Sequence, residues 1–299
     1  MVLNSLKDLL PFFREKGGRK NLVIVRPEDS HTALAIQKTF EEGVILPILI
    51  GDREKITAAF AEAGADAAAF RIIEAEEDSE AVRKAVQAIH AGEADFLMKG
   101  TLETKDLLRG LVSKEAGMRT DRIMSKFDIM ENPGYHKLIS LSDSAMNPKP
   151  DVKMKKQIIE NAVDVLHALG IAQPKVAVLA AAETLNPKLQ ESADAWELKQ
   201  MYDAGEITGC ILEGPISIDL AMDPESVKIK KYGSPVGGDT DLLICPDLVS
   251  GNMMGKGMLL TGAKAAGIIV GAKTPVVLMS RGASVEDKMY SIILGAIAA

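Results

Sequence analysis

The residues best placed to do chemistry follow an apolar run late in the sequence. Ser280 and Arg281 come directly after the run at 275–279, PVVLM, which has the composition of a buried strand. Ligands of parallel sheets bind beyond the carboxyl ends of the strands, so both side chains are expected at a ligand site. The planar guanidinium of Arg281 can donate two hydrogen bonds to phosphate at once. The pair therefore predicts a site for a phosphate-like anion.

Asp287 is the third candidate in this segment, and its residue type suits a base. The local pattern also has a second interpretation. Ser284 and Asp287 have the spacing of a capping box, in which the acid only stabilises the start of a helix. The local sequence leaves both roles open.

A second candidate anion site follows the apolar run at 241–245. Ser250, Gly251 and Asn252 are interpreted as a loop entering a helix, whose free N–H groups could bind an anion. An ordinary helix capped by Ser250 fits the same residues. Lys256 and Lys264 are expected on that helix, where a lysine is more often solvated than bound to phosphate.

Several familiar catalytic motifs are missing from the sequence. GNMMGKG at 251–257 has three residues between its first two glycines where a Walker loop needs four, and Gly257 replaces the Mg²⁺-binding Ser or Thr. No strand-like run is followed by the G-x-G-x-x-G fingerprint of dinucleotide binding, and no G-x-S-x-G elbow occurs. The histidines are scattered, which argues against a histidine-ligated zinc site. No metal site is therefore predicted.

The elements that must position these residues alternate along the chain. Short apolar runs without polar alternation indicate strands buried on both faces. These runs lie at 21–25, 45–50, 71–75, 95–98, 175–181, 209–212, 241–245, 267–272 and 275–280, with helical patterns between most of them at 31–43, 79–93, 152–170 and 193–206. The alternation predicts an α/β fold of open, doubly wound domains with largely parallel sheets.

The length of 299 residues suggests two domains. The turn-rich passage at 140–151 contains two prolines and precedes a long helical pattern, so it is the predicted boundary. The chain is expected to cross back near 281–284, so that its last segment returns to the first domain. The first domain is therefore predicted at 1–141 plus 284–299 and the second at 142–283, with the active site in the cleft between them.

Composition excludes several classes of protein. Charged residues make up 26% and hydrophobic residues 47%, which is typical of a globular rather than a disordered chain. The formal net charge of −7 has the wrong sign for a general nucleic-acid binder. Neither a signal peptide nor an apolar run long enough to span a membrane is visible. The two cysteines are too few for a disulfide framework, so the cytoplasm is the expected location.

Taken in order, several segments resemble the phosphotransacetylases and phosphotransbutyrylases. They are LMKGTLETKDLLRGLV at 97–112, SDSAMNPKP at 142–150, GP followed by Asp219, SPVGG at 234–238, PDL-x-x-GN-x-x-x-K at 246–256 and SRG-x-S-x-x-D at 280–287. Each is modest alone, but their order and spacing are specific. The resemblance implies two open α/β domains like those of isocitrate and isopropylmalate dehydrogenases, and a homodimer or higher oligomer. It also implies coenzyme A as a substrate, with no cofactor.

The resemblance further implies roles for individual residues. Ser280, Arg281 and Asp287 match the family's catalytic serine, arginine and aspartate, and Arg109 matches an arginine that handles phosphate or coenzyme A. Four other positions are expected to bind phosphate or coenzyme A: Thr101, Gly251, Asn252 and Lys256.

The reaction that the resemblance implies is acyl-CoA + phosphate ⇌ acyl phosphate + CoA, by direct attack without a metal. The C-terminal third looks more like phosphotransbutyrylases, which favours a butyryl or another short or branched acyl group, with acetyl as the runner-up. Ser144 stands where acetyl-specific members often have Cys, and Gly255 stands where an aromatic residue is usual. The alternatives of other classes are a dehydrogenase of the same fold, acting on a phosphorylated hydroxy acid, and a non-catalytic acyl-CoA-binding protein.

Overall fold

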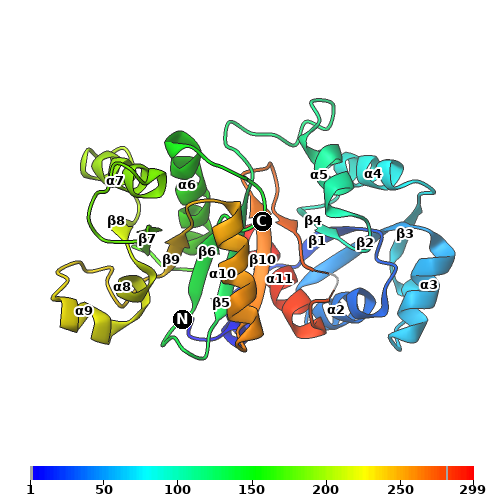
Figure 1. Cartoon of the computed structure of the whole chain (residues 1–299). Helices are drawn as coiled ribbons and strands as arrows, with labels where there is room; N and C mark the ends of the chain where they lie inside the picture. Colours follow the sequence, from blue (N-terminus) through cyan, green and yellow to red (C-terminus); the bar gives the residue numbers. More distant parts are fainter. Residues whose placement is uncertain (1–2, 281) are drawn as a thin grey trace. The chain divides into compact units, whose positions relative to one another are not determined.

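The computed structural model describes residues 3–280 and 282–299, and the chain forms two compact units (Figure 1). The N-terminal unit consists of Lys7–Arg122 together with Ala266–Ala299. The central unit consists of Ile123–Ala265 together with the residues up to Leu6. The N-terminal unit is therefore built from two stretches of chain that are far apart in the sequence.

The sheet of the N-terminal unit has the strand order β3-β2-β1-β4-β11-β10. Its strands are parallel except for the antiparallel pair of β11 and β10. The strands are β1 (Lys20–Val25), β2 (Ile45–Gly51), β3 (Arg71–Glu74), β4 (Phe96–Lys99), β10 (Lys264–Val270) and β11 (Val276–Val277). The apolar side chains of β1, β4 and β11 are buried, as central strands covered on both faces require, whereas those of the edge strand β3 are partly exposed.

Most helices of the N-terminal unit follow these strands, while the 3₁₀ turn η1 (Leu6–Asp8) and the helix α1 (Leu9–Lys16) precede β1. Those that follow strands are the 3₁₀ turn η2 (Ala67–Ala69) and the helices α2 (Ser30–Glu41), α3 (Arg53–Glu62), α4 (Asp78–His90), α5 (Thr104–Val112) and α11 (Val285–Ala298). Side chains cap several of their first turns, as at Asp29 of α2 and Asp52 of α3, whose carboxylates accept backbone N–H groups.

The central unit has the strand order β5-β6-β9-β7-β8, in which only β5 runs antiparallel to its neighbour. Its strands are β5 (Ser125–Glu131), β6 (Ile139–Ser142), β7 (Lys175–Leu179), β8 (Ile211–Ile216) and β9 (Leu242–Ile244). Its helices are α6 (Val152–Ala168), α7 (Gln190–Asp203), α8 (Ile218–Met222), α9 (Pro224–Lys230) and α10 (Leu248–Leu260). This arrangement confirms the predicted α/β class with a largely parallel sheet.

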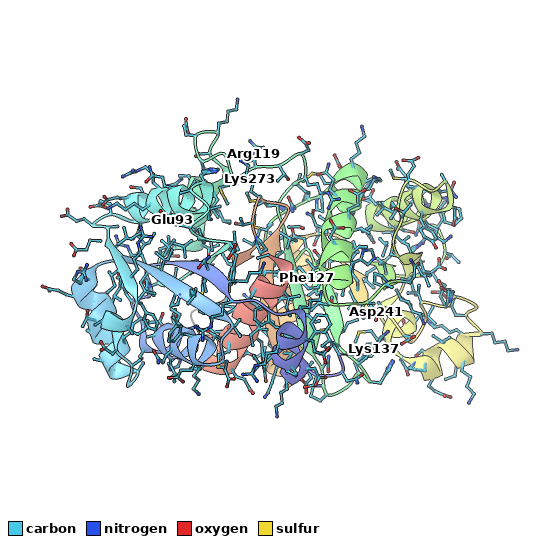
Figure 2. The ribbon with its side chains drawn as sticks, turned by 180° about the vertical axis from the view of Figure 1, so that it is seen from behind. Glu93, Arg119, Phe127, Lys137, Asp241 and Lys273 are labelled. Atoms are coloured by element: carbon cyan, nitrogen blue, oxygen red, sulfur yellow. The ribbon has the colours of Figure 1, made fainter. Side chains whose placement is uncertain are left out.

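A cluster of ion pairs lies at the amino ends of the strands in the central unit. The Lys137 ammonium lies 2.7 Å from Asp241 and 2.8 Å from Asp239, and Figure 2 labels Lys137 and Asp241 at this edge. Burial alone would raise the pKa of Asp239, but hydrogen bonds from Lys137, Lys175 and His136 outweigh it and hold that pKa well below its usual range. The cluster lies at the edge opposite to the one where parallel sheets bind ligands.

The two units divide the chain at other places than the predicted boundaries of 141/142 and 283/284. Residues 123–141 contain β5, which pairs with β6, and β6 pairs with β9, so this stretch belongs to the central unit. Residues 266–283 contain β11, which pairs with β4, so this stretch belongs to the N-terminal unit. β5 and β6 are the two strands that the apolar runs did not predict.

Candidate active site

The parallel neighbours β1, β4 and β11 of the N-terminal unit end at the same edge of the sheet. Val277 of β11 lies opposite Met98 of β4, so Ser280 and Thr101 each lie three residues beyond a matched pair. Adjacent strands are about 4.8 Å apart, which brings these two chain segments together at the carboxyl edge. Ser280 is exposed there, while its predicted neighbour Arg281 lies outside the described residues.

Thr101 is held in place by the end of β1. Its backbone N–H donates to the carbonyl oxygen of Arg26 at 2.8 Å, and its hydroxyl donates to the same oxygen at 3.2 Å. Gly100 allows this close approach, because a Cβ atom there would lie 1.9 Å from the Arg26 carbonyl oxygen. The predicted binding residue Thr101 is therefore fixed to the β1 strand end.

Asp287 takes part in the helix cap that the sequence offered as its second role. Ser284 is the N-cap of α11, and its hydroxyl oxygen accepts the Asp287 backbone N–H at 3.1 Å. The same hydroxyl donates to the Asp287 carboxylate at 2.7 Å. The cap is thus present, and the predicted catalytic role of Asp287 stays a prediction.

Arg109 lies on the wall of a cavity between α4 and α5. Its guanidinium pairs with Asp106 at 3.1 Å, and its side chain is 67% exposed. The cavity has a volume of about 790 Å³, within the range of small-molecule sites. Arg26, the first residue after β1, also lines this cavity. It therefore shares the cavity with Arg109, the arginine that the sequence predicted on α5.

In the central unit, the SDSAMNPKP segment folds around one buried carboxylate. Asp143 is only 3% exposed, and both of its carboxylate oxygens accept hydrogen bonds. The donors are the backbone N–H groups of Lys126 (3.1 Å), Ala145 (3.0 Å), Met146 (3.1 Å) and Asn147 (3.0 Å), and the Asn147 side-chain amide (2.5 Å). The Asp and Asn of this motif therefore build the loop after β6.

The start of α10 differs from the prediction. The helix begins at Leu248 with Asp247 as its N-cap, and the Asp247 carboxylate accepts the Ser250 backbone N–H at 2.8 Å. The Gly251 N–H donates to the Asp247 carbonyl at 3.1 Å, so it is a helical donor rather than an open anion site. Gly251 instead permits close packing, because a Cβ there would lie 2.4 Å from the Asp143 carbonyl oxygen.

The other predicted residues of this segment lie on different elements: Asn252 and Lys256 on α10, and Lys264 on β10. The Asn252 side-chain amide donates to the Ser144 carbonyl at 3.2 Å, which joins α10 to the loop after β6. Lys256 is exposed on α10, whereas Lys264 is the first residue of β10 and not part of the helix. Two motifs that lie about a hundred residues apart in the chain therefore meet through Gly251 and Asn252.

A buried polar chain lies behind this loop. The Lys126 ammonium is 2.6 Å from the Asp128 carboxylate, whose second oxygen accepts the Ser144 hydroxyl at 2.7 Å.

Burial raises the pKa of the Cys245 thiol far above its usual range, and burial raises that of Cys210 to about 11. Neither thiol is therefore available as a thiolate near neutral pH.

Asp219, the acid of the GP-Asp motif, lies in α8 directly after β8. The nearby Ser217 hydroxyl and a hydrogen bond from Lys230 (Nζ to Oδ2, 2.9 Å) lower its pKa to about 2. Asp219 is therefore a carboxylate at every physiological pH.

The predicted residues divide between the two units. Thr101 and Ser280 follow neighbouring strands of the N-terminal unit, and Asp287 lies in the first turn of α11 of the same unit. Gly251 and Asn252 pack on the loop after β6 of the central unit. Sequence reasoning missed Arg26 and the structural role of Asp143. A charged residue directly after an apolar run, as in VIVRPED, was the available signal for Arg26.

Two searches of the described residues are negative. No three His, Cys, Asp or Glu side chains within 3–280 and 282–299 come together in a group that could hold a metal ion. In the same residues, no helix combines the length and the apolar character that crossing a bilayer requires.

Comparison with known proteins identifies relatives over the whole chain. Residues 79–296 match the family model of phosphate acetyl/butaryl transferases. The chain is 36% identical to a phosphate butyryltransferase of Clostridium acetobutylicum, over 100% of this chain and 99% of the relative. It is 38% identical to a phosphate acetyltransferase of Thermotoga maritima, over 98% of this chain and 99% of the relative.

A solved structure gives a similar result. A branched-chain phosphotransacylase from Enterococcus faecalis superimposes with a TM-score of 0.82 at 30% sequence identity. The match covers 93% of this chain and 98% of that protein. The similarity therefore extends over both units and is not confined to the segments that the sequence motifs mark.

Proposed function

Because the chain belongs to the phosphate acetyl/butaryl transferase family and is therefore an acyltransferase, we propose that it uses butyryl or another short or branched acyl group. Its reaction is acyl-CoA + phosphate ⇌ acyl phosphate + CoA. The observation that carries the proposal is the end-to-end match to the Clostridium butyryltransferase. The likeness to the branched-chain phosphotransacylase supports it.

The test is a comparison of kcat/KM across acyl-CoA lengths with phosphate as the acceptor. We expect butyryl-CoA or a branched C4 to C5 acyl-CoA to be preferred over acetyl-CoA. The discrimination should be graded, because one buried methylene contributes only about 1 to 3 kcal/mol. A strong preference for acetyl-CoA would establish the runner-up, which the Thermotoga relative supports.

The proposed mechanism assigns one task to each site residue. The Ser280 hydroxyl donates a hydrogen bond to the carbonyl oxygen as negative charge develops there. Arg281 and Arg109 bind the phosphate or the phosphoryl group. Asp287 accepts the thiol proton of coenzyme A when that sulfur attacks the acyl phosphate, since a thiol with a pKa of about 8.5 is mostly protonated at neutral pH. The acyl–phosphate bond then breaks and phosphate leaves.

Residues of the central unit support substrate binding in this proposal. Asn252 and Gly251 fix the first turns of α10 to the loop that Asp143 organises. Lys256 is exposed on the same helix, where its ammonium can pair with a phosphate of coenzyme A. Because the Gly251 N–H is used within the helix, its contribution is the close packing rather than a hydrogen bond to the anion.

We also propose that coenzyme A is a substrate and that the reaction needs no metal or other cofactor. Guanidinium groups can neutralise the phosphate charge that a metal would otherwise offset. Dialysis against EDTA should then leave the rate unchanged. A loss of activity that Zn²⁺ or Mg²⁺ restores would contradict this.

The homodimer implied by the family is proposed to form through α10. Its inner face carries Met254 and Met258, which pack on the core, while Val249, Met253 and Leu260 are 60%, 69% and 89% exposed. These three residues lie at helical spacing on one face, which also carries Lys256. Pairing with the same face of a second copy would bury the apolar side chains, while the long Lys256 side chain can extend past the interface and keep its ammonium accessible.

Light scattering on the eluting protein tests this interface. Leu260→Lys should shift the mass from that of a dimer or higher oligomer to that of one chain. The matched control is Ile229→Lys on α9, an apolar residue that is 72% exposed and lies outside this face of α10. A Leu260→Lys variant with an unchanged mass would place the interface elsewhere.

A cytoplasmic location is also proposed. The two cysteines are free and buried, which suits a reducing compartment. Fractionation of cells that produce the protein should recover the activity in the cytosol, and recovery from the medium or the membrane fraction would contradict the proposal.

A further inference from the structure

Arg26 has a backbone conformation that its residue type rarely adopts. Its φ angle is +57°, in the left-handed region, and it is the first residue after β1. The residue is only 6% exposed. Non-glycine residues persist in this region only where the surrounding structure holds them, and they concentrate at functional sites.

The Arg26 side chain ties together segments that follow different strands. Its guanidinium donates to the Asp78 carboxylate at 2.8 Å and to the Glu28 carboxylate at 3.2 Å. It also donates to the carbonyl oxygens of Ala75 at 3.0 Å and Glu76 at 2.6 Å. These hydrogen bonds therefore hold the segment between β3 and α4 against the end of β1.

The Arg26 backbone acts on the next strand along the sheet. Its carbonyl oxygen accepts both the N–H and the hydroxyl of Thr101, and it fills the space that a side chain at Gly100 would need. The left-handed φ and the guanidinium bonds fix the direction of this carbonyl. A change at Arg26 that moves this carbonyl oxygen therefore moves Thr101.

We propose that Arg26 is a positioning residue that fixes Thr101 for phosphate binding beside Ser280. The N–H bond at 2.8 Å holds the Thr101 backbone, while its hydroxyl can turn its proton from the Arg26 carbonyl, 3.2 Å away, to a bound phosphate. The inference rests on the proposed function, because Thr101 follows β4 at the position that matches Ser280 after β11. The Arg26 guanidinium makes four hydrogen bonds to the protein and the residue is 6% exposed, so it acts on the substrate through Thr101. A role limited to holding the loops together would affect stability without distinguishing the two substrates.

The experiment measures KM for phosphate and for butyryl-CoA in the purified full chain. Arg26→Asn keeps a residue type that tolerates a left-handed φ but removes the guanidinium. We expect it to raise the phosphate KM about tenfold while the butyryl-CoA KM changes less than about twofold. The matched control is Arg71→Asn, which removes an exposed arginine that pairs with Glu93 at 2.6 Å, and it should change neither KM.

A double-mutant cycle tests whether the effect passes through Thr101. Thr101→Val removes the hydroxyl, and in that background Arg26→Asn should raise the phosphate KM clearly less than in the wild type. Equal effects in both backgrounds, or equal changes of the two KM values, would overturn the inference. If Arg26→Asn does not fold, Asp78→Ala removes one guanidinium acceptor and should raise the phosphate KM alone, and an unchanged phosphate KM would overturn the inference.

The failure of the proposed function is a different result. A wild-type protein that does not convert any acyl-CoA and phosphate would contradict the function itself. A wild-type protein that turns over normally, with Arg26 variants indistinguishable from it, would contradict only the role of Arg26.

Discussion

The carboxylate of Asp287 accepts a hydrogen bond of 2.7 Å from the Ser284 hydroxyl, which in turn accepts the Asp287 backbone N–H at 3.1 Å. The helix cap and the proposed base therefore use the same side chain. To take a proton from coenzyme A, Asp287 must act while it remains part of the cap. A conservative substitution can separate the two roles, because an amide caps a helix but does not accept a thiol proton.

Asp287→Asn should lose most of its thiolysis activity near neutral pH, by about a hundredfold or more if Asp287 is the base. Activity should recover in part toward pH 9, because the thiol then ionises without help. The measurement is the rate from pH 6 to pH 9 together with the melting temperature, with Ser284→Ala as the control for the cap. Near-normal activity of Asp287→Asn across this range would assign the residue to the cap alone.

Ser280→Ala should lower kcat by about a hundredfold or more and leave the substrate KM values nearly unchanged, because its hydrogen bond strengthens only as charge develops on the carbonyl oxygen. Ser280 is exposed, so the melting temperature should not change. Steady-state kinetics with both substrates checks this. A variant with raised KM and normal kcat would assign Ser280 to ground-state binding instead.

Two glycines of α10 should respond in opposite ways to the same substitution. Gly251→Ala places a Cβ 2.4 Å from the Asp143 carbonyl oxygen and should destabilise the protein by about 1 to 3 kcal/mol. Gly257→Ala meets no atom within 4 Å and should be neutral or stabilising by up to about 1 kcal/mol. Urea unfolding of both variants gives the comparison. Similar stabilities would show that α10 does not depend on its close approach to the loop after β6.

Asp219 should make the stability of the protein sensitive to acid. Its pKa is lowered from 3.8 to about 2 in the folded chain, so the folded state binds the proton less readily than the unfolded state. The resulting stabilisation is complete above the ordinary value and is lost as the pH falls through about 2. The free energy of unfolding of wild type minus that of Asp219→Asn should therefore shrink from pH 5 to pH 2. Lys230→Met should weaken the same dependence, and a constant difference would contradict the assignment.

The strands that the sequence predicted are those whose burial needs only apolar residues. Ile45–Gly51 contains no charged residue and Lys175–Leu179 is apolar after its first residue, and both form largely buried strands. β5 did not fit this pattern, because its sequence contains Lys126 and Asp128. These residues neutralise each other at 2.6 Å, which permits their burial, and only the folded structure reveals that pairing. The shifted unit boundary follows from this missed strand.

In the candidate site, too, the sequence predicted what local patterns determine and missed what depends on contacts between distant segments. The position of Ser280 after a strand was predictable, because PVVLM is an uninterrupted apolar run. The start of α10 was misplaced because Ser250 was taken for the cap, although Asp247 and Ser250 together have the spacing of a capping box. The role of Arg26 was out of reach, since it depends on a left-handed φ and on acceptors about fifty residues away. Local patterns predicted where elements end but not which ends meet.

The discontinuous N-terminal unit constrains how the protein can be synthesised. β11 lies between β4 and β10 in the sheet, yet it is translated after the entire central unit. A chain still on the ribosome must hold β4 with an unpaired edge until the last tenth of the protein emerges. Unpaired edges are templates for aggregation. Slow translation through the final segment, or its loss by premature termination, should therefore leave an aggregation-prone intermediate that depends on chaperones. That intermediate carries Thr101 and Arg109 but lacks Ser280 and Asp287.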